Sequence, residues 1–255
     1  MSHIGTHRDG AIQRIELNRP EKKNALTREM YSQLATAIDA AEADAAVRVM
    51  LLHGAGDAFT AGNDLHDFIA GFTLDDAGSP HRFLRSISHA AKPIVAAVHG
   101  AAIGIGTTML AHCDLVFAAE SARFQLPFVN LGICPEAASS VLLPALVGYA
   151  RATELILLGE PFSARTAREI GFITEVVPDA ELLVVATTAA RKLADKPPAA
   201  LRAAKDLLKR PLMPQIEAAL AEEAKQFRAL VSSPEAKEAF AAFLEKRKPD
   251  FSQLR

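Results

Sequence analysis

The strongest constraint on the fold comes from three short and almost purely apolar runs, residues 47–52, 93–98 and 115–118. Such runs are typical of strands that are covered on both faces, as in a parallel sheet between layers of helices. Residues 11–17 instead alternate apolar and polar side chains, which indicates a strand with one covered face. Helix-like segments separate these strands, and the alternation predicts a layered α/β architecture.

Helical periodicity completes the expected organisation. Thr27 is placed to cap a helix with an apolar residue at every fourth position, and a short helix is expected at 104–111. Beyond residue 195, amphipathic helices either cover the core of the same chain or pack against another subunit, and periodicity leaves both open. We therefore expect a core at 1–195 and a helical subdomain at 196–255. Further helices are expected at 138–147, 151–158, 163–170 and 179–194, with an extended segment at 172–177.

Charge and composition exclude several classes of function. The formal net charge is −2 and no run of Lys or Arg occurs, so neither nucleic acid nor an anionic membrane surface is an expected partner. No apolar run is long enough to span a bilayer. Cys113 and Cys134 lack the spacing of a metal site or a disulfide framework, and neither terminus carries a recognisable address. We expect a soluble, cytoplasmic protein that acts on small molecules and has no metal site.

Glu136 lies alone in the otherwise uncharged stretch 130–140 and directly follows Pro135. An isolated carboxylate in such surroundings is a candidate base for proton transfer. An acidic residue in the first turn of a helix also interacts favourably with the exposed N–H groups and the helix dipole. Local sequence leaves both interpretations of Glu136 open.

Two glycine-rich turns, residues 53–65 and 99–106, each follow an expected buried strand and lead toward a helix. The first N–H groups of a helix have no internal partner and bind negative charge, so two converging turns are able to form an oxyanion hole. Glycines also occur simply where a turn is tight. Met109 occupies the place of the third glycine of a dinucleotide fingerprint, which argues against that kind of site.

Five ordered segments resemble the crotonase, or enoyl-CoA hydratase/isomerase, superfamily. The resemblance implies a crotonase-like α/β core of ββα spiral turns at 1–195. It also implies that residues 196–255 are a C-terminal α-helical trimerisation region, in a homotrimer or a dimer of trimers. The expected partner is an acyl-CoA thioester substrate, with no cofactor beyond the coenzyme A that the substrate carries. The five segments are 18–26, 59–65, 92–100, 113–114 and 122–132.

The matched motifs also imply roles for individual residues. The backbone N–H groups of Asn63 and Ile105 are expected to hold the thioester oxygen. Ala61 and the loop with Lys22 and Lys23 are expected near the nucleotide end, although the two lysines also fit a solvated turn. Asp64 fits a helix cap as well as a second acid. The residues matched to coenzyme A binding are Lys22, Lys23, Ala25, Ala61, Asp64, Leu65 and Gly104.

Two positions separate hydratases from isomerases in this superfamily. Hydratases use two glutamates to position a water, and here Thr108 and Phe128 occupy those places, neither of which acts as a base near neutral pH. The segment around Glu136 is instead similar to peroxisomal-type Δ3,Δ2-enoyl-CoA isomerases, in which one glutamate is catalytic. The expected activity is therefore that isomerisation. The alternatives are hydration or another crotonase reaction, and a non-catalytic acyl-CoA-binding trimer.

Residues 71–81 have the composition of a surface loop, and a helix is expected at 84–90. In the superfamily this region borders the acyl tail, so both segments are expected to influence the accepted chain length.

Overall fold

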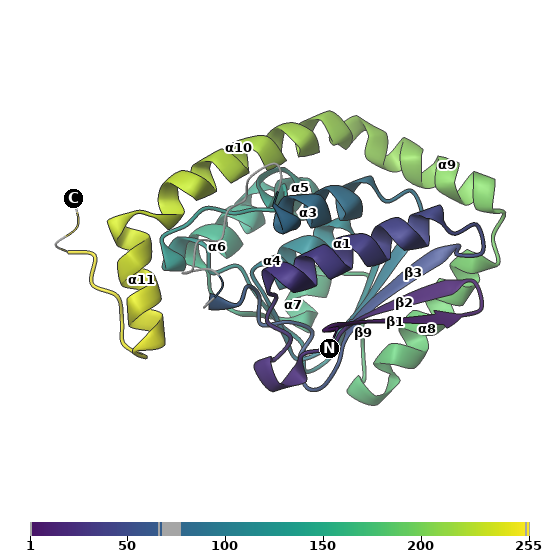
Figure 1. Ribbon diagram of the computed structural model, residues 1–255, viewed down its shortest axis with the longest axis horizontal. Coiled ribbons are helices and arrows are strands. Elements are labelled where there is room, and N and C mark those ends of the chain that lie inside the picture. Colours follow the sequence, from purple (N-terminus) through teal and green to yellow (C-terminus); the bar gives the residue numbers. More distant parts are fainter. Residues whose placement is uncertain (1, 66, 68–77, 253, 255) are drawn as a thin grey trace.

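The computed structural model describes residues 2–65, 67, 78–252 and 254. Within these residues, six strands form the main sheet in the order β1-β2-β3-β4-β6-β9. Only β1 and β2 pair antiparallel, and the remaining neighbours are parallel. Figure 1 shows helices on both sides of this sheet. The strands are β1 Ile4–Asp9, β2 Ile12–Leu17, β3 Val49–Gly54, β4 Ile94–Val98, β6 Leu115–Ala119 and β9 Glu175–Val177.

Alternate residues of the central strands enter two separate hydrophobic clusters, which explains why these strands are apolar throughout. On one face, Met50 and Leu52 of β3 pack in the cluster that contains helix α1 (Arg28–Ala43) and helix α3 (Ser79–His89). On the other face, Leu51 packs with helix α8 (Leu182–Ala194). The prediction of strands covered on both faces is confirmed for this sheet.

A second, smaller sheet includes part of the second glycine turn, residues 99–106. It consists of β5 (Ala101–Ile103), β7 (Arg123–Gln125) and β8 (Phe162–Ser163), none of which the sequence patterns indicated. Strands of two or three residues are too short to show a period of their own. Strand β1 was also not anticipated. The single helix expected at 104–111 is divided into helix α4 (Ile105–Thr108) and the 3-10 helix η2 (Met109–His112).

The helices that follow agree with the sequence pattern within a few residues. The Thr27 hydroxyl accepts a hydrogen bond from the N–H of Met30, so the cap expected for α1 is present. Helix α3 begins at Ser79, earlier than the helix expected at 84–90. Most of the expected loop at 71–81 lies outside the described residues. The helices that follow β7 in the chain are α5 Ser139–Val147, α6 Tyr149–Leu158, α7 Ala164–Glu169 and then α8.

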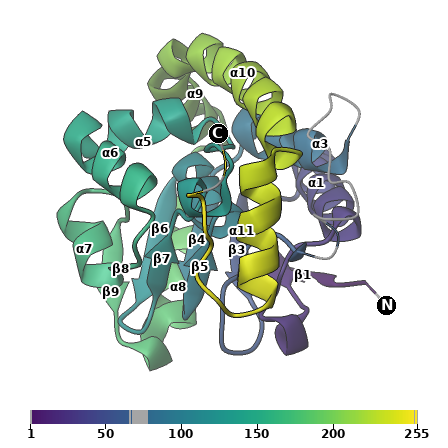
Figure 2. The ribbon, with the colours of Figure 1, turned by 90° about the vertical axis from the view of Figure 1, so that its left-hand side faces the viewer.

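The C-terminal helices α10 and α11 pack against earlier parts of the same chain. Helix α10 (Met213–Val231) places Ile216, Leu220 and Phe227 in the main core cluster of its own chain. Helix α11 (Pro234–Leu244) lies so close to Gly132 that a Cβ there would meet the Ala236 nitrogen at 2.7 Å. Figure 2 shows α10 passing over the molecule and α11 descending beside the sheets. Both helices therefore fold back over their own chain, and the division at residue 195 stays a prediction.

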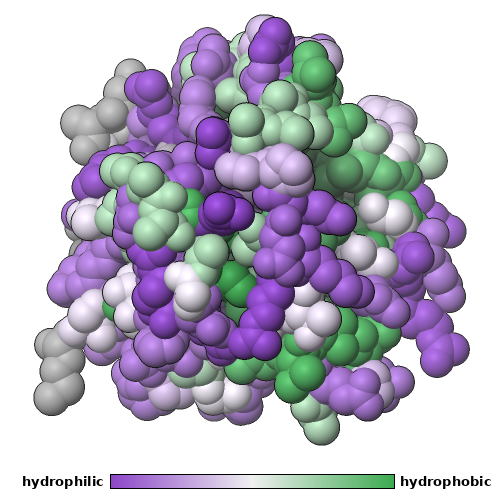
Figure 3. Space-filling view, turned by 90° about the vertical axis from the view of Figure 1, so that its right-hand side faces the viewer, coloured by the Kyte–Doolittle hydropathy of each residue, from purple (hydrophilic) through white to green (hydrophobic). Residues whose placement is uncertain are grey.

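Helix α9 (Pro198–Lys209) leaves apolar side chains uncovered, because Leu207 and Leu208 are 66% and 81% exposed. The end of the molecule that carries α9 and the β1–β2 hairpin shows apolar patches among hydrophilic side chains (Figure 3). A role of residues 196–255 in trimer formation stays a prediction. Among the described residues, no helix is both long enough and apolar enough to cross a membrane.

Candidate active site

The two glycine turns lie in direct contact. The Thr60 N–H donates to the Ala101 carbonyl over 2.9 Å, and the Ile103 N–H donates to the Thr60 carbonyl over 3.1 Å. A Cβ on Gly106 would meet the Thr60 Cγ2 at 2.5 Å, and one on Gly62, where φ is +91°, would meet the Ile103 oxygen at 2.8 Å. Glycine is therefore required at both places by close approach of the two turns.

Two backbone amides are left open by this arrangement. Ile105 begins α4 after Gly104, whose φ of 55° and ψ of −117° turn the chain sharply, and the first N–H of a helix has no intrahelical acceptor. At the other turn, the Leu26 N–H donates to the Gly62 carbonyl and the Leu26 carbonyl accepts from the Asp64 N–H. Leu26 therefore makes no hydrogen bond with the N–H of Asn63, which lies between them. Among the described residues, neither the Asn63 N–H nor the Ile105 N–H donates to another protein group. Both are free to bind a ligand oxygen.

Asn63 and Ile105 line the same cavity, which has a volume of about 350 Å³. Helix α11 supplies part of its wall, so residues far apart in the chain form it. Its apolar lining includes Leu65, Phe128, Leu131, Ile133, Phe240 and Phe243, and its polar lining includes Gln125, Asn130 and Arg247.

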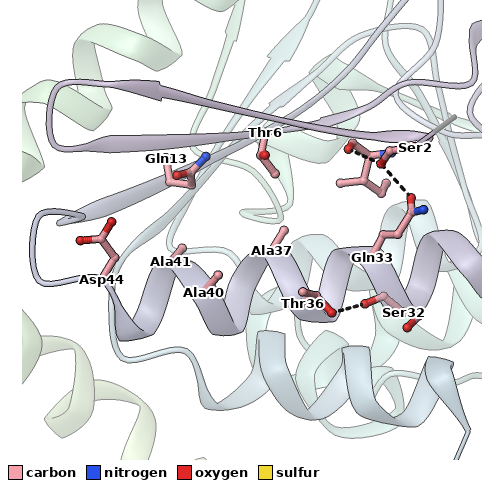
Figure 4. A pocket seen from close by; sticks show the side chains of 11 residues that line it. Ser2, Thr6, Gln13, Ser32, Gln33, Thr36, Ala37, Ala40, Ala41 and Asp44 are labelled. Atoms are coloured by element: carbon pink, nitrogen blue, oxygen red, sulfur yellow. Dashed lines mark hydrogen bonds between the residues drawn. The ribbon is translucent and has the colours of Figure 1, made fainter.

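A second cavity, of about 420 Å³, lies between the β1–β2 hairpin and α1 and is lined by polar side chains such as Ser32, Gln33 and Thr36 (Figure 4). None of the residues expected to bind or react with a ligand lines this second cavity. The cavity beside the two amides is therefore the candidate active site.

Glu136 is buried, with 4% of its surface exposed, and its Oε1 accepts a hydrogen bond from the Thr108 hydroxyl over 2.9 Å. Thr108 is the last residue of α4, the helix that begins at Ile105. The pKa of Glu136 is raised to about 8, mainly by burial and less by the nearby Glu223 carboxylate, against a lowering by the Thr108 hydrogen bond. The Glu136 carboxylate is thus able to exchange a proton near neutral pH.

Glu136 does not serve the helix that follows it. Ala137 and Ala138 adopt left-handed conformations, with φ of 62° and 55°, and α5 begins only at Ser139 with no acidic residue in its first turn. The carboxylate that accepts from this helix terminus belongs to Glu223 of α10, which the sequence analysis missed. The helix-dipole interpretation of Glu136 is therefore wrong. Glu223 lies within a helical sequence pattern, and no neighbouring residue in the sequence indicates this contact.

Tyr31 is a second residue that the sequence analysis missed. Its side chain is buried in α1, and its hydroxyl donates to the Asn63 Oδ1 over 2.5 Å. Burial raises the pKa of Tyr31 well above its usual value, and the Glu136 charge adds to the shift. Tyr31 thus holds the Asn63 side chain on the turn that carries the Asn63 amide. Its apolar ring fits the core stripe of α1 and concealed this polar contact.

The loop expected at the nucleotide end lies beside the first glycine turn. The Ala61 N–H donates to the Lys23 carbonyl over 2.9 Å, and Lys22 and Lys23 both have exposed side chains. Buried Asn24 holds this loop by donating to the Ala55 and Ala58 carbonyls over 2.8 and 2.7 Å. Contact of either lysine with a phosphate stays a prediction.

The remaining residues that were expected to bind coenzyme A lie in or beside the same region. The Asp64 carboxylate pairs with Arg19 at 2.6 Å and accepts from the Asp67 N–H at 3.4 Å, contacts that favour the interpretation as a cap over that of a second acid. Leu65 and Gly104 line the cavity, whereas Ala25 is half-buried beside the loop and does not line it.

Comparison with known proteins places this geometry in context. The family model described as Enoyl-CoA hydratase/isomerase matches residues 7–254. The chain is 39% identical to a Bacillus subtilis protein named Probable enoyl-CoA hydratase, over 89% of this chain and 90% of that protein. It is 36% identical to Enoyl-CoA delta isomerase 2 of Rattus norvegicus, over 94% of this chain and 63% of that protein.

A solved structure of an enoyl-CoA hydratase/isomerase from Pseudoalteromonas atlantica T6c matches with a TM-score of 0.94 and 41% identity. The match covers 98% of this chain and 100% of the other. The expected α/β crotonase fold, with helices at its C-terminal end, is thereby confirmed.

Proposed function

The chain belongs to the enoyl-CoA hydratase/isomerase family, and on that premise we propose that it converts a 3-enoyl-CoA to the 2-trans-enoyl-CoA. The observation that carries this proposal is the burial of the Glu136 carboxyl group, which the Thr108 hydroxyl holds and whose pKa is raised to about 8. Thr108 and Phe128, in the places of the two hydratase glutamates, offer no second base. Phe128 lines the cavity and makes that wall apolar.

The reaction needs one group that first removes a proton and then returns it. The Glu136 carboxylate takes a proton from C2, and the electron pair that is released delocalises over the former double bond and onto the thioester oxygen. The N–H groups of Asn63 and Ile105 stabilise the resulting dienolate oxygen. The Glu136 carboxylic acid then delivers the proton to C4, and the double bond between C2 and C3 forms.

Both parts of this machinery are required. One oxyanion donor contributes about 3–4 kcal/mol of transition-state stabilisation. Positioned acid–base transfer contributes roughly 10²–10⁴-fold, or about 3–5 kcal/mol. A C2 proton is barely acidic until the thioester oxygen is stabilised, so neither contribution suffices without the other.

The hydrogen bond from Thr108 supports this assignment. It holds the Oε1 atom of Glu136, whose side chain does not itself line the cavity of the two amides. Thr108 also ties the carboxylate to α4, whose first N–H is one of the two expected donors. The Glu136 carboxyl group is therefore hydrogen-bonded to the same short helix that begins with one of the two oxyanion donors.

A direct assay tests the proposal. We expect the purified protein to convert a 3-enoyl-CoA to the 2-trans isomer, detected by the absorbance of the conjugated thioester. Glu136→Gln should lower kcat roughly 10²–10⁴-fold while thioester binding is retained, because the amide cannot accept the C2 proton. Glu154→Gln, at an exposed site on α6, is the matched control. Undiminished turnover by Glu136→Gln would remove Glu136 from this role.

Hydration is the second candidate, because one similar protein bears the name Probable enoyl-CoA hydratase. The same preparation is therefore offered a 2-trans-enoyl-CoA, and 3-hydroxyacyl-CoA is measured. Hydration as fast as isomerisation would establish the second candidate. Thioester binding without either reaction would establish a non-catalytic acyl-CoA-binding protein.

A further inference from the structure

The turn that carries Glu136 is held by side chains from three other elements. Thr108 of α4 donates to the Glu136 carboxylate, as described above. His112 Nε2 lies 2.8 Å from the carbonyl oxygen of Ala137, the residue that follows Glu136. Burial lowers the pKa of His112 to about 3, so the ring is neutral, and its Nε2 carries the hydrogen because a carbonyl only accepts. The third contact comes from Glu223 of α10.

Glu223 makes the largest number of these contacts. Its Oε2 accepts from the Ala138 N–H over 2.7 Å, and its Oε1 accepts from the Ser140 N–H over 2.9 Å and from the Ser140 hydroxyl. Ala138 and Glu223 are 85 residues apart in the chain. These three donors lie at the N-terminus of α5, so Glu223 acts as the N-terminal cap that α5 lacks locally.

Hydrophobic packing does not explain why the Glu223 side chain is buried. Its side chain is 7% exposed, and it lies on the face of α10 that otherwise buries Ile216, Leu220 and Phe227. None of the ion pairs between described residues involves Glu223. A buried carboxylate without a cation is unfavourable unless hydrogen bonds satisfy it, and an apolar residue would cost less on this face.

The backbone beside Glu136 needs such support. Ala137 and Ala138 both have positive φ, a conformation that residues with a Cβ rarely adopt and that persists only where surrounding contacts impose it. The Ala138 N–H is held directly by Glu223. Loss of that contact would allow the turn to relax and the Glu136 side chain to move with it.

We propose that Glu223 is a positioning residue for Glu136, which it holds in place by clamping the left-handed turn at Ala137 and Ala138 from the C-terminal helix α10. The inference rests on the proposed function, since it concerns the same proton transfer. It also assigns the C-terminal helices a part in catalysis in addition to covering the core.

The charge of Glu223 provides a second readout. The Glu136 side chain is faced by Thr108 of α4, by Tyr31 of α1 and by Glu223 of α10. Glu223 is itself faced by Glu136, by the Ser140 donors and by Cys134, whose thiol donates to the Glu223 backbone carbonyl. Burial raises the pKa of Glu223 itself. Where Glu223 is ionised, its negative charge raises the pKa of Glu136, so its removal should lower that pKa.

The test compares Glu223→Gln and Glu223→Ala with Glu222→Gln, a matched control at the neighbouring exposed carboxylate of α10. We expect kcat of the two Glu223 variants to fall about 10- to 100-fold with little change in KM, since misplacement of a reacting group costs rate more than binding. The pH at which kcat is half-maximal should move downward. Ser140→Ala, which retains two of the three contacts, should show a smaller loss.

A purely structural role for Glu223 predicts a different result. It would reduce thermal stability or the fraction of active protein and leave the pH profile in place, and that outcome would overturn the inference. If Glu223→Ala does not fold, the nearly isosteric Glu223→Gln still gives a pH profile. If Glu136→Gln is inactive but both Glu223 variants match Glu222→Gln, only the positioning role fails. If Glu136→Gln remains active, the proposed function fails and the positioning role with it.

Discussion

The two glycine turns that carry the Asn63 and Ile105 amides meet each other mainly through main-chain contacts, whereas the turn that carries Glu136 is held by side chains. Thr60 pairs through its main chain with Ala101 and Ile103, and these bonds do not depend on which side chains are present. The Glu136 turn contains no strand or helix and depends on Thr108, His112 and Glu223. The first region is held mainly by main-chain contacts between the two turns, and the second is held by side chains from other elements.

This difference matters because the two regions supply different chemistry. An oxyanion donor needs an N–H in one place and has no protonation state to adjust near neutral pH. A proton-transfer group needs both a position and a suitable pKa, and the pKa depends on what surrounds the carboxylate. Remote side chains are able to set both properties of Glu136 at once.

The largest effect in the backbone-held region is expected for Gly62→Ala. Here φ is +91°, and the new Cβ would meet the Ile103 oxygen at 2.8 Å, so the Asn63 amide must shift. Loss of one oxyanion donor predicts a fall in kcat of about 10²–10³-fold. Gly10→Ala is the control, because it has a positive φ of +59°, open space around it and a location in the β1–β2 turn. Equal kcat for the two variants would show that the Asn63 amide is not needed.

In the region held by side chains, stability should depend on pH through Glu136. Its pKa is raised in the folded state from 4.5 to about 8, so folding binds a proton between these pH values and becomes less favourable as pH rises through them. Glu136→Gln should match the wild type below about pH 4.5 and exceed it increasingly toward pH 8, by on the order of a few kcal/mol. Denaturant unfolding measured across this range provides the check. A constant difference between the two proteins would contradict the raised pKa.

The reaction rate should show the opposite dependence on pH. The carboxylate form of Glu136 is the base, so kcat/KM should rise about tenfold per pH unit below the pKa of about 8 and level off above it. Steady-state isomerisation between pH 6 and pH 9 tests this expectation. A flat profile would indicate either a lower pKa or a step other than proton transfer as rate-limiting.

The smallest effect is expected at Tyr31, whose hydroxyl contacts the turn that carries the Asn63 amide. Tyr31→Phe removes the hydrogen bond to the Asn63 side chain but leaves the Asn63 backbone N–H in place. A single hydrogen bond of about 1 kcal/mol predicts a loss of roughly fivefold in kcat. Tyr149→Phe, at a side chain that is 78% exposed, is the control. A loss as large as that of Gly62→Ala would mean that the Asn63 side chain, and not only its amide, takes part.

Several elements of the fold were accessible to prediction because their signal lies within a short segment. The apolar runs that became β3, β4 and β6 required two covered faces, and the Thr27 cap was visible next to the stripe of α1. The convergence of two glycine turns was also predicted from their positions after neighbouring strands. By contrast, β5, β7 and β8 contain two or three residues each, and no periodicity is detectable over that length.

The order of residues was enough to indicate the layered strands, the glycine turns and Glu136 as a candidate base, because hydrophobic period and turn chemistry act over a few neighbouring positions. The contacts around Glu136 followed only from folding, since Glu223 reaches Ala138 across 85 residues and Thr108 arrives on another helix. The raised pKa of Glu136 has the same origin, because burial and a neighbouring charge are properties of the packed interior. No local pattern specifies how far water is excluded from a carboxylate.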